Sequence, residues 1–341
     1  MTRSLKVQLL FSMSFFIVLL LGFFNFVEKR HSETLSTKLE SIQSQLNELQ
    51  TDFMKLHGIV KPNAKRKPNI KLVNSEDIDT FFGDILILVT SNIEHREQRE
   101  SIRISWGDST RFKNHRRKYN NTTYKTYFVT GYQQNAIAEA KTESSIYRDM
   151  LITNRTEQYW DLSRRLMFGF LWSLKSCSYN YLLKTDDDVF VNIPNLFALI
   201  YKDPFVLKHE DRVFAGLIYP KNGPIRDPSS KWYVPREEWA ADYYPFFATG
   251  MANILSRLVV EKIRPYFDWQ NPFRLDDVYV GMLISRAQIP GIGIRVSENK
   301  MEFAGFHSGE ECDYIESAVT YHKVATSLCM EKLARRSIQQ T

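Results

Sequence analysis

The chain has 341 residues, enough to bury a large core in one big domain or two smaller ones. Hydrophobic residues make up 43% of the sequence and charged residues 25%, which argues against disorder throughout. The net charge of +6 comes from scattered basic residues that concentrate only in residues 61–71. We therefore favour an exposed basic linker there and no nucleic-acid-binding surface.

The first apolar segment, residues 7–27, contains no charged side chain. As a helix it would extend about 30 Å, the thickness of the hydrocarbon core of a bilayer. We predict a transmembrane helix. A cleaved signal peptide is the alternative, but the segment is long for a signal core and no Ala-x-Ala-like site follows it. Basic residues flank both ends, so charge alone leaves the orientation open.

A heptad-like pattern follows between residues 35 and 56. Apolar residues recur there at spacings of four and three: Leu35, Leu39, Ile42, Leu46, Leu49, Phe53 and Leu56. This a/d pattern predicts a short coiled coil and a homodimer formed through it. A single amphipathic helix docked on the globular part is the alternative. Pro62 and Pro68 then end any helix, and we expect the folded domain to start near Asp84.

From Asp84 onward, strand and helix patterns alternate. Residues 84–90 form a continuous apolar run typical of a buried parallel strand, and residues 124–130 predict a second strand that stops at Gly131. Residues 94–106 are compatible with a helix, and apolar residues recur at helical spacing over 162–174. This order predicts an α/β sheet with ligands beyond the carboxyl ends of its strands.

Three sequons begin at Asn120, Asn121 and Asn154, and they are glycosylation candidates if this part of the chain is lumenal or extracellular. The three cysteines, Cys177, Cys312 and Cys329, all follow the apolar segment. An oxidising compartment would permit one disulfide and leave one free thiol. The sequence does not choose among the three pairings.

Three consecutive carboxylates, Asp186, Asp187 and Asp188, stand between two short runs of strand-forming residues. In extended backbone, Asp186 and Asp188 would face one side and Asp187 the other. Two carboxylates on one face suit a hard divalent cation such as Mn²⁺ or Mg²⁺, which also takes ligands from substrate phosphates. An acidic turn or a helix start is the alternative, because Asp favours both.

A second acidic pair, Asp276 and Asp277, precedes a helical pattern over residues 282–287. Taken alone, the pair is best explained as a helix N-cap. Together with the three aspartates, however, it gives the chain a metal-compatible site and a separate carboxylate that can act as a base. Metal-assisted transfer to a hydroxyl group requires both.

From Arg99 to about His322 the sequence resembles the β-1,3-galactosyltransferase group of glycosyltransferase family 31, which includes related β-1,3-N-acetylglucosaminyltransferases. The resemblance rests on ordered blocks, which cover about two thirds of the chain. These blocks are residues 99–106, residues 128–131 with Glu143, Tyr147 and Asp149, the stretch 184–192 that contains the three aspartates, residues 231–235 and residues 277–281.

The resemblance implies a type II Golgi membrane protein. Residues 1–6 would be the cytoplasmic tail, 7–27 the signal anchor, 28–83 the stem and 84–341 the lumenal catalytic domain. That domain would have a GT-A fold, a Rossmann-like α/β fold with a mostly parallel central sheet that binds a UDP-sugar donor and a divalent metal, Mn²⁺. The reaction would invert the configuration at the anomeric carbon.

The resemblance also implies roles for individual residues. Asp188, with Asp186, would hold Mn²⁺ against the UDP diphosphate, and His322 would complete the metal shell, although a surface histidine is the alternative. Asp277 would be the general base. The donor-binding candidates are Arg99, Arg103, Arg165, Lys184, Asp186 and Asp187, and an arginine in such a block can equally brace the fold.

Three departures from the family pattern concern the donor pocket. Asp276 stands where the family usually has Glu, Asn154 and Arg155 replace an Asp-Phe pair, and residues 244–253 lack a second Gly and a Tyr. The leading hypothesis is transfer of galactose from UDP-galactose to the 3-hydroxyl of an acceptor sugar on a glycoprotein or glycolipid. The alternatives are the same transfer from UDP-N-acetylglucosamine and a catalytically silent lumenal protein that binds sugar or UDP.

Overall fold

The structure is a computed structural model that describes residues 70–74, 78–218, 222–295, 305–306, 312, 314–324 and 326–340. The predicted transmembrane helix, the predicted coiled coil and most of the basic linker lie outside these residues. In the part that is described, no helix combines the length and the apolar character that a membrane crossing needs.

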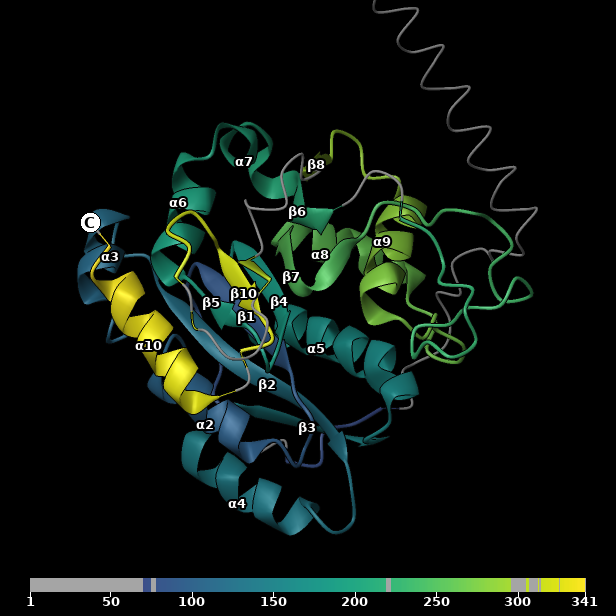
Figure 1. Cartoon of the computed structure of the whole chain (residues 1–341), viewed down its shortest axis with the longest axis horizontal. Coiled ribbons are helices and arrows are strands. Elements are labelled where there is room, and N and C mark those ends of the chain that lie inside the picture. Colours follow the sequence, from purple (N-terminus) through teal and green to yellow (C-terminus); the bar gives the residue numbers. More distant parts are fainter. Residues whose placement is uncertain are drawn as a thin grey trace, which may run out of the picture. The chain divides into compact units, whose positions relative to one another are not determined.

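A seven-stranded sheet occupies the centre of the domain, with the strand order β3-β2-β1-β4-β7-β6-β8 (Figure 1). Among the described strands of this sheet, β7 alone runs antiparallel to its neighbours. The prediction of a mostly parallel α/β sheet is therefore confirmed. The strands are β1 (Ile85–Thr90), β2 (Tyr124–Tyr132), β3 (Met150–Thr156), β4 (Tyr181–Asp186), β6 (Val213–Ile218), β7 (Ala248–Ser256) and β8 (Gly293–Arg295).

Strand β2 continues through Gly131, where the sequence predicted that it would stop. The pairing between β2 and β3 shifts register between Thr130 and Tyr132, and the Gly131 N–H donates to the carboxylate of Glu157 at 2.7 Å. Strand β2 continues past this irregularity because the Glu157 carboxylate accepts the hydrogen bond from the Gly131 N–H in place of a backbone carbonyl of β3.

Helices cover both faces of the sheet, which gives the three layers of an α/β fold. On one face, Ile87 and Val89 of β1 share a buried cluster with Trp106, Phe197 and Leu333. On the other face, the ring of Tyr127 packs edge-on against Trp172, with 4.9 Å between centroids. The helices are α2 (Arg96–Ile104), α3 (Lys113–Lys118), α4 (Ile137–Tyr147), α5 (Leu162–Ser176), α6 (Ile193–Lys202), α7 (Pro204–His209), α8 (Arg257–Ile263), α9 (Asp276–Ala287) and α10 (Ser327–Ile338), with short 3-10 turns η1 (Tyr159–Asp161), η2 (Glu210–Arg212) and η3 (Arg264–Tyr266).

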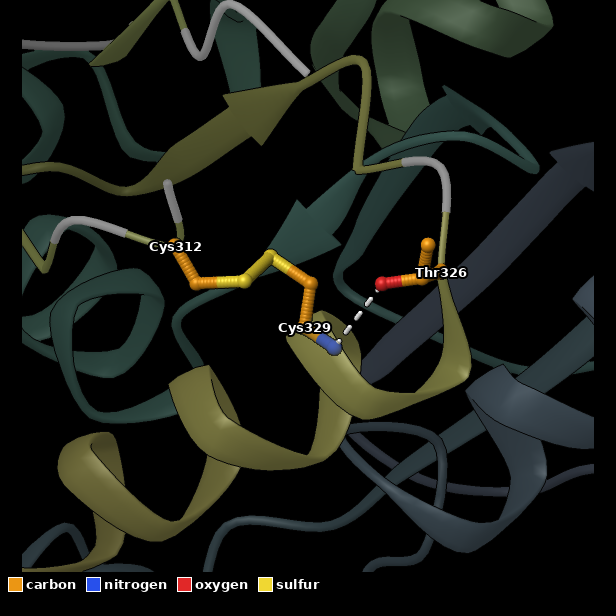
Figure 2. Close-up of a disulfide and its surroundings, with 3 residues drawn as sticks. All are labelled: Cys312, Thr326 and Cys329. Atoms are coloured by element: carbon orange, nitrogen blue, oxygen red, sulfur yellow. Dashed lines mark hydrogen bonds between the residues drawn. A yellow bond between two sulfur atoms is a disulfide. The ribbon is translucent and has the colours of Figure 1, made fainter. Parts of the chain in front are cut away.

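A small second sheet has the order β5-β10-β9 and consists of β5 (Phe190–Val191), β10 (Thr320–His322) and β9 (Gly305–Phe306). It ties the chain after the three aspartates to the C-terminal segment. Figure 2 shows the disulfide between Cys312 and Cys329, with the Thr326 hydroxyl accepting from the Cys329 N–H at 3.2 Å at the start of α10. The disulfide settles the cysteine pairing that the sequence left open. Cys177 is a buried free thiol.

The packed chain begins before Asp84, where we expected the folded domain to start. Ile70 is buried, and Leu72 forms an isolated bridge with Thr153 of β3. The Asn74 side chain donates to the Met150 carbonyl at 2.9 Å. The residues described between 70 and 83 therefore belong to the same folded unit as the sheet.

Candidate active site

A cleft of about 520 Å³ opens beyond the carboxyl end of β4, beside the first turn of α9 and the end of β10. Its acidic lining consists of Asp186, Asp188, Asp276 and Asp277, and His322 and Lys323 line it as well. The two acidic sites, which lie far apart in the sequence, therefore meet in one cavity. This is the edge of the sheet at which α/β folds bind their ligands.

The three consecutive aspartates separate into two directions. Asp186 ends β4, and its Oδ1 accepts from the Thr90 hydroxyl at 2.5 Å. Asp187 and Asp188 lie in the turn that follows. Asp187 faces away from the cleft, since its Oδ2 accepts from the Ser91 hydroxyl at 2.7 Å and lies 2.9 Å from His95 Nδ1. Asp186 and Asp188 thus share one side, although a turn and not a continuous strand produces the alternation.

Asp188 and His322 come together across the junction of the two sheets. The Asp188 Oδ2 lies 3.6 Å from His322 Nε2, and the Val324 N–H donates to the Asp188 carbonyl at 2.8 Å, which fixes the two segments against each other. Both side chains are partly exposed, so a ligand can reach them. A carboxylate oxygen and an imidazole nitrogen suit a divalent cation such as Mn²⁺.

The described residues hold no group of three or more His, Cys, Asp or Glu side chains that could bind a metal ion. Asp188 and His322, with Asp186 on the same side of the cleft, therefore fit an open site and not a closed protein cage. Divalent cations in such sites complete their coordination with water and substrate phosphates. The residues present are compatible with the predicted metal, and the metal itself stays a prediction.

Lys184 is buried between the two acidic sites. Its ammonium lies 2.8 Å from Asp186 Oδ1, 2.9 Å from Asp276 Oδ2 and 3.3 Å from the Gly250 carbonyl oxygen. Burial alone would lower the pKa of Lys184, but the two carboxylates raise it above its ordinary value. The ammonium donates to Asp186 and to the Gly250 carbonyl and forms an ion pair with Asp276, so its charge is compensated within the fold. The contacts favour a bracing role for Lys184 over the predicted contact with the donor.

Asp277 lies in the first turn of α9, with Leu275 at the N-cap position. The N-cap interpretation is therefore wrong for both Asp276 and Asp277. Burial raises the pKa of Asp277 to about 7, and the charge of Asp276 adds to this effect. A carboxyl with a pKa near neutrality is ionised in part at physiological pH and holds a proton well once it receives one, as a general base must.

Because Gly281 has no side chain, α9 packs closely against the loop that precedes β7. A Cβ at Gly281 would lie 2.5 Å from the Phe246 carbonyl oxygen and 2.6 Å from the Phe247 Cβ. A larger residue would push the helix away from this loop and move Asp277 with it. This contact gives a physical reason for the glycine that ends the motif at residues 277–281.

The three predicted donor-binding arginines have carboxylate partners within the fold. Arg99 is buried and donates twice to Glu143, at 2.8 Å each, and Arg103 donates twice to Asp149, also at 2.8 Å each. Arg165 forms a buried ion pair with Glu157. In the described structure all three lie outside the lining of the cleft. These contacts favour the alternative interpretation, in which the arginines brace the loops around the site.

The three sequon asparagines lie at the surface. Asn120 and Asn121 occupy the turn between α3 and β2 with φ of 53° and 57°, a left-handed conformation that Asn tolerates well. Asn154 is exposed on β3, and its side-chain oxygen accepts from the Lys71 N–H at 2.9 Å. The positions are accessible, and their glycosylation stays a prediction.

The structure adds Tyr159 and Trp232 to the cleft, which the sequence did not assign to it. Tyr244 and Phe247 line the cleft as well, and they come from the segment 244–253 that the sequence placed at the donor pocket. Trp232 stands in one of the blocks that resemble the family, so the sequence contained a signal for it. For Tyr159 it contained none, because only the folded chain brings η1 to this cavity.

Comparisons with known proteins place the chain in a family. Residues 97–295 match the family model described as galactosyltransferase. The chain is 31% identical over 208 residues to beta-1,3-galactosyltransferase 1 of Mus musculus and of Homo sapiens, covering 60% of this chain and 61% of the relative. It is 29% identical to beta-1,3-galactosyltransferase 5 of Pan paniscus, covering 60% of this chain and 65% of the relative. The chain thus spans less than two thirds of the length of these relatives.

Among solved structures, a glycosyltransferase involved in the glycosylation of the major capsid of PBCV-1 is similar over 74% of this chain and 99% of that protein. Its sequence identity is 13% and the TM-score is 0.32. Similarity at this level carries no weight for either fold or function.

Proposed function

The chain belongs to the galactosyltransferase family, and we propose that it is an inverting, metal-dependent transferase that moves galactose from UDP-galactose to the 3-hydroxyl of an acceptor sugar. The acceptor would be a glycan on a protein or a lipid. The observation that carries this proposal is the convergence of Asp188, His322 and Asp277 in one cleft. Such a cleft offers a place for a diphosphate and its cation beside a base for a hydroxyl group.

The chemistry assigned to Asp277 is proton transfer. The oxygen of the acceptor hydroxyl forms a bond to the anomeric carbon of the donor sugar, the bond from that carbon to the UDP oxygen breaks, and the proton passes to the Asp277 carboxylate. Attack from the face opposite UDP inverts the configuration. Asp188 and His322 would hold a divalent cation, which when bound neutralises charge on the departing diphosphate.

We also propose that the protein is a single-pass type II membrane protein of the Golgi with its catalytic domain in the lumen. The apolar segment 7–27 and the three sequons support this location. The disulfide between Cys312 and Cys329 is compatible with an oxidising compartment. Dimerisation through the stem stays part of the same proposal, based on the heptad pattern alone.

The first test is UDP release by the full-length protein in detergent, with UDP-galactose and UDP-N-acetylglucosamine compared side by side. We expect release from UDP-galactose with Mn²⁺, loss of release on chelation with EDTA, and recovery when Mn²⁺ is restored. Faster release from UDP-N-acetylglucosamine would change the assigned donor sugar and leave the assigned reaction type unchanged. Activity that survives chelation would rule out the metal. If neither donor is turned over and UDP still binds, the silent binding protein is the correct alternative.

A second experiment tests the metal assignment in the absence of turnover. Asp188→Ala removes a carboxylate that lies 3.6 Å from His322, so we expect the affinity for UDP in the presence of Mn²⁺ to fall about tenfold or more. Isothermal titration with and without Mn²⁺ measures this effect. Asp211→Ala, at an exposed position in η2, is the matched control. Unchanged affinity in Asp188→Ala would exclude Asp188 as a ligand.

A further inference from the structure

Two large aromatic side chains lie at the mouth of the cleft and remain open to solvent. Tyr159 in η1 is 42% exposed, and Trp232 in the segment between β6 and β7 is 47% exposed. Both line the cleft, and Trp232 hydrogen-bonds the Tyr159 hydroxyl. Two segments that are distant in the sequence thus join to present an aromatic surface. Exposed apolar groups that are gathered at a cavity mark a ligand site more often than a chance surface feature.

This aromatic pair lines the same cavity as Asp277, the proposed base. Asp188 and His322, which line it as well, suit a diphosphate and its cation. A ligand that rests on the aromatic pair and presents a hydroxyl group to Asp277 is an acceptor and not UDP.

Two hydroxyl groups in the same cleft lack protein partners. Among the described residues, the Tyr244 Oη and the Thr249 Oγ1 are buried side-chain atoms with no hydrogen-bond partner. Both residues line the cavity. Buried hydroxyls without a partner cost stability unless a ligand or water satisfies them. The cleft thus combines open aromatic faces with two hydroxyls for which the fold itself supplies no partner.

A pyranose sugar has the matching chemistry. One face carries C–H groups with partial positive charge, which the negative face of an aromatic ring attracts, and its rim carries hydroxyl groups. We propose that Tyr159 and Trp232 form the acceptor subsite and stack against the apolar face of the acceptor pyranose, while the hydroxyls of Tyr244 and Thr249 bond to its hydroxyl groups. This inference rests on the proposed transferase function and names the part of the chain that selects the acceptor.

Lys231 has a place in this subsite. Its ammonium lies 4.5 Å from the centroid of the Trp232 ring and also lines the cleft. In the absence of acceptor, the flexible cation covers the ring through a cation–π contact. The C–H groups of a bound pyranose take over that position, and the ammonium is then free to bond a hydroxyl of the acceptor.

The test compares Trp232→Ala and Trp232→Phe with Tyr243→Ala in the full-length protein. Tyr243 is the matched control, because it lies in the same inter-strand segment and is 55% exposed but lies outside the lining of the cleft in the described structure. UDP release is measured at saturating UDP-sugar with benzyl β-glycosides of N-acetylglucosamine, N-acetylgalactosamine and galactose as separate acceptor probes. UDP affinity and melting temperature are measured on the same samples.

We expect Trp232→Ala to raise the KM of the accepted probe about tenfold or more with unchanged affinity for UDP, because the lost aromatic contact serves the acceptor alone. Trp232→Phe keeps an aromatic ring, so its acceptor KM should stay close to the wild-type value. Tyr243→Ala should have the same acceptor KM as the wild type. An unchanged acceptor KM in Trp232→Ala, or a raised KM for the UDP-sugar in its place, would overturn the subsite while leaving the transferase function intact. Absence of turnover by the wild type with every donor and probe would refute the function and the subsite together.

Discussion

Asp277→Asn should lower kcat about 100- to 10,000-fold, the range that a general base typically contributes. The change keeps the size of the side chain and removes its ability to accept the proton of the acceptor hydroxyl. Because Asp277 is assigned to the acceptor hydroxyl, and Asp188 and His322 are assigned to the cation, the affinity for UDP with Mn²⁺ should stay at the wild-type value. UDP release and isothermal titration on the same preparation measure both quantities. Near-normal turnover would remove Asp277 from the reaction.

The pH dependence of activity gives an independent measurement of the same group. Asp277 works as a base only when it is ionised, and burial raises its pKa to about 7. We therefore expect kcat/KM to rise with pH and to level off above about pH 7. A bound cation that stabilises the ionised form would shift the inflection to a lower pH. In Asp277→Asn this dependence should vanish. A rate that falls as pH rises through neutrality would contradict the assignment.

The same pKa shift predicts that the stability of the folded state falls as pH rises, whereas activity rises. The folded protein binds the Asp277 proton more tightly than the unfolded chain, because the pKa rises from 3.8 to about 7 on folding. Between about pH 4 and pH 7 the unfolded chain loses this proton and the folded protein keeps it, so the stability of the folded state falls as pH rises through this window. Asp277→Asn removes this loss, so its melting temperature should rise relative to the wild type as pH increases through that window. Differential scanning calorimetry at several pH values measures the effect.

The sheet could be predicted because its signals are local. A continuous apolar run such as residues 85–90 is compatible with only a few buried elements, and its alternation with helical patterns favours parallel strands. Local geometry also predicted that Asp186 and Asp188 share one side and that Asp187 faces the other. The backbone forms a turn at Asp187 where an extended strand was expected, but the turn separates the side chains in the same way.

The partners of buried charges could not be predicted, because they depend on contacts between distant segments. Arg99 and Arg103 stand in a block close to the expected donor site, yet their carboxylate partners come from α4 and the residue before β3. The disulfide pairing depends in the same way on where the chain returns after β9. Likewise, the contact between Tyr159 and Trp232 exists only once η1 and the segment after β6 meet at the cleft.

Lys184→Met should destabilise the protein by about 3 kcal/mol, because it leaves two carboxylates facing each other without the cation that holds them. We place the effect at the lower end for a broken buried ion pair, since the Asp186 side chain is 32% exposed and water can take up part of its charge. Urea denaturation measures the change. Lys125→Met is the matched control: its ion pair with Asp79 is partly exposed, so it should cost at most about 1 kcal/mol.

The double variant Lys184→Met with Asp276→Asn separates charge from packing. If Lys184 stabilises the site by neutralising Asp276, removing that carboxylate as well should restore part of the lost stability. Catalysis should remain impaired in both variants, because the ammonium that ties the first turn of α9 to β4 and to the Gly250 carbonyl is absent. Lys184→Met with wild-type turnover and stability would show that the two acidic sites hold their positions without it. The expected loss of both would show that one buried lysine connects the proposed cation site to the proposed base.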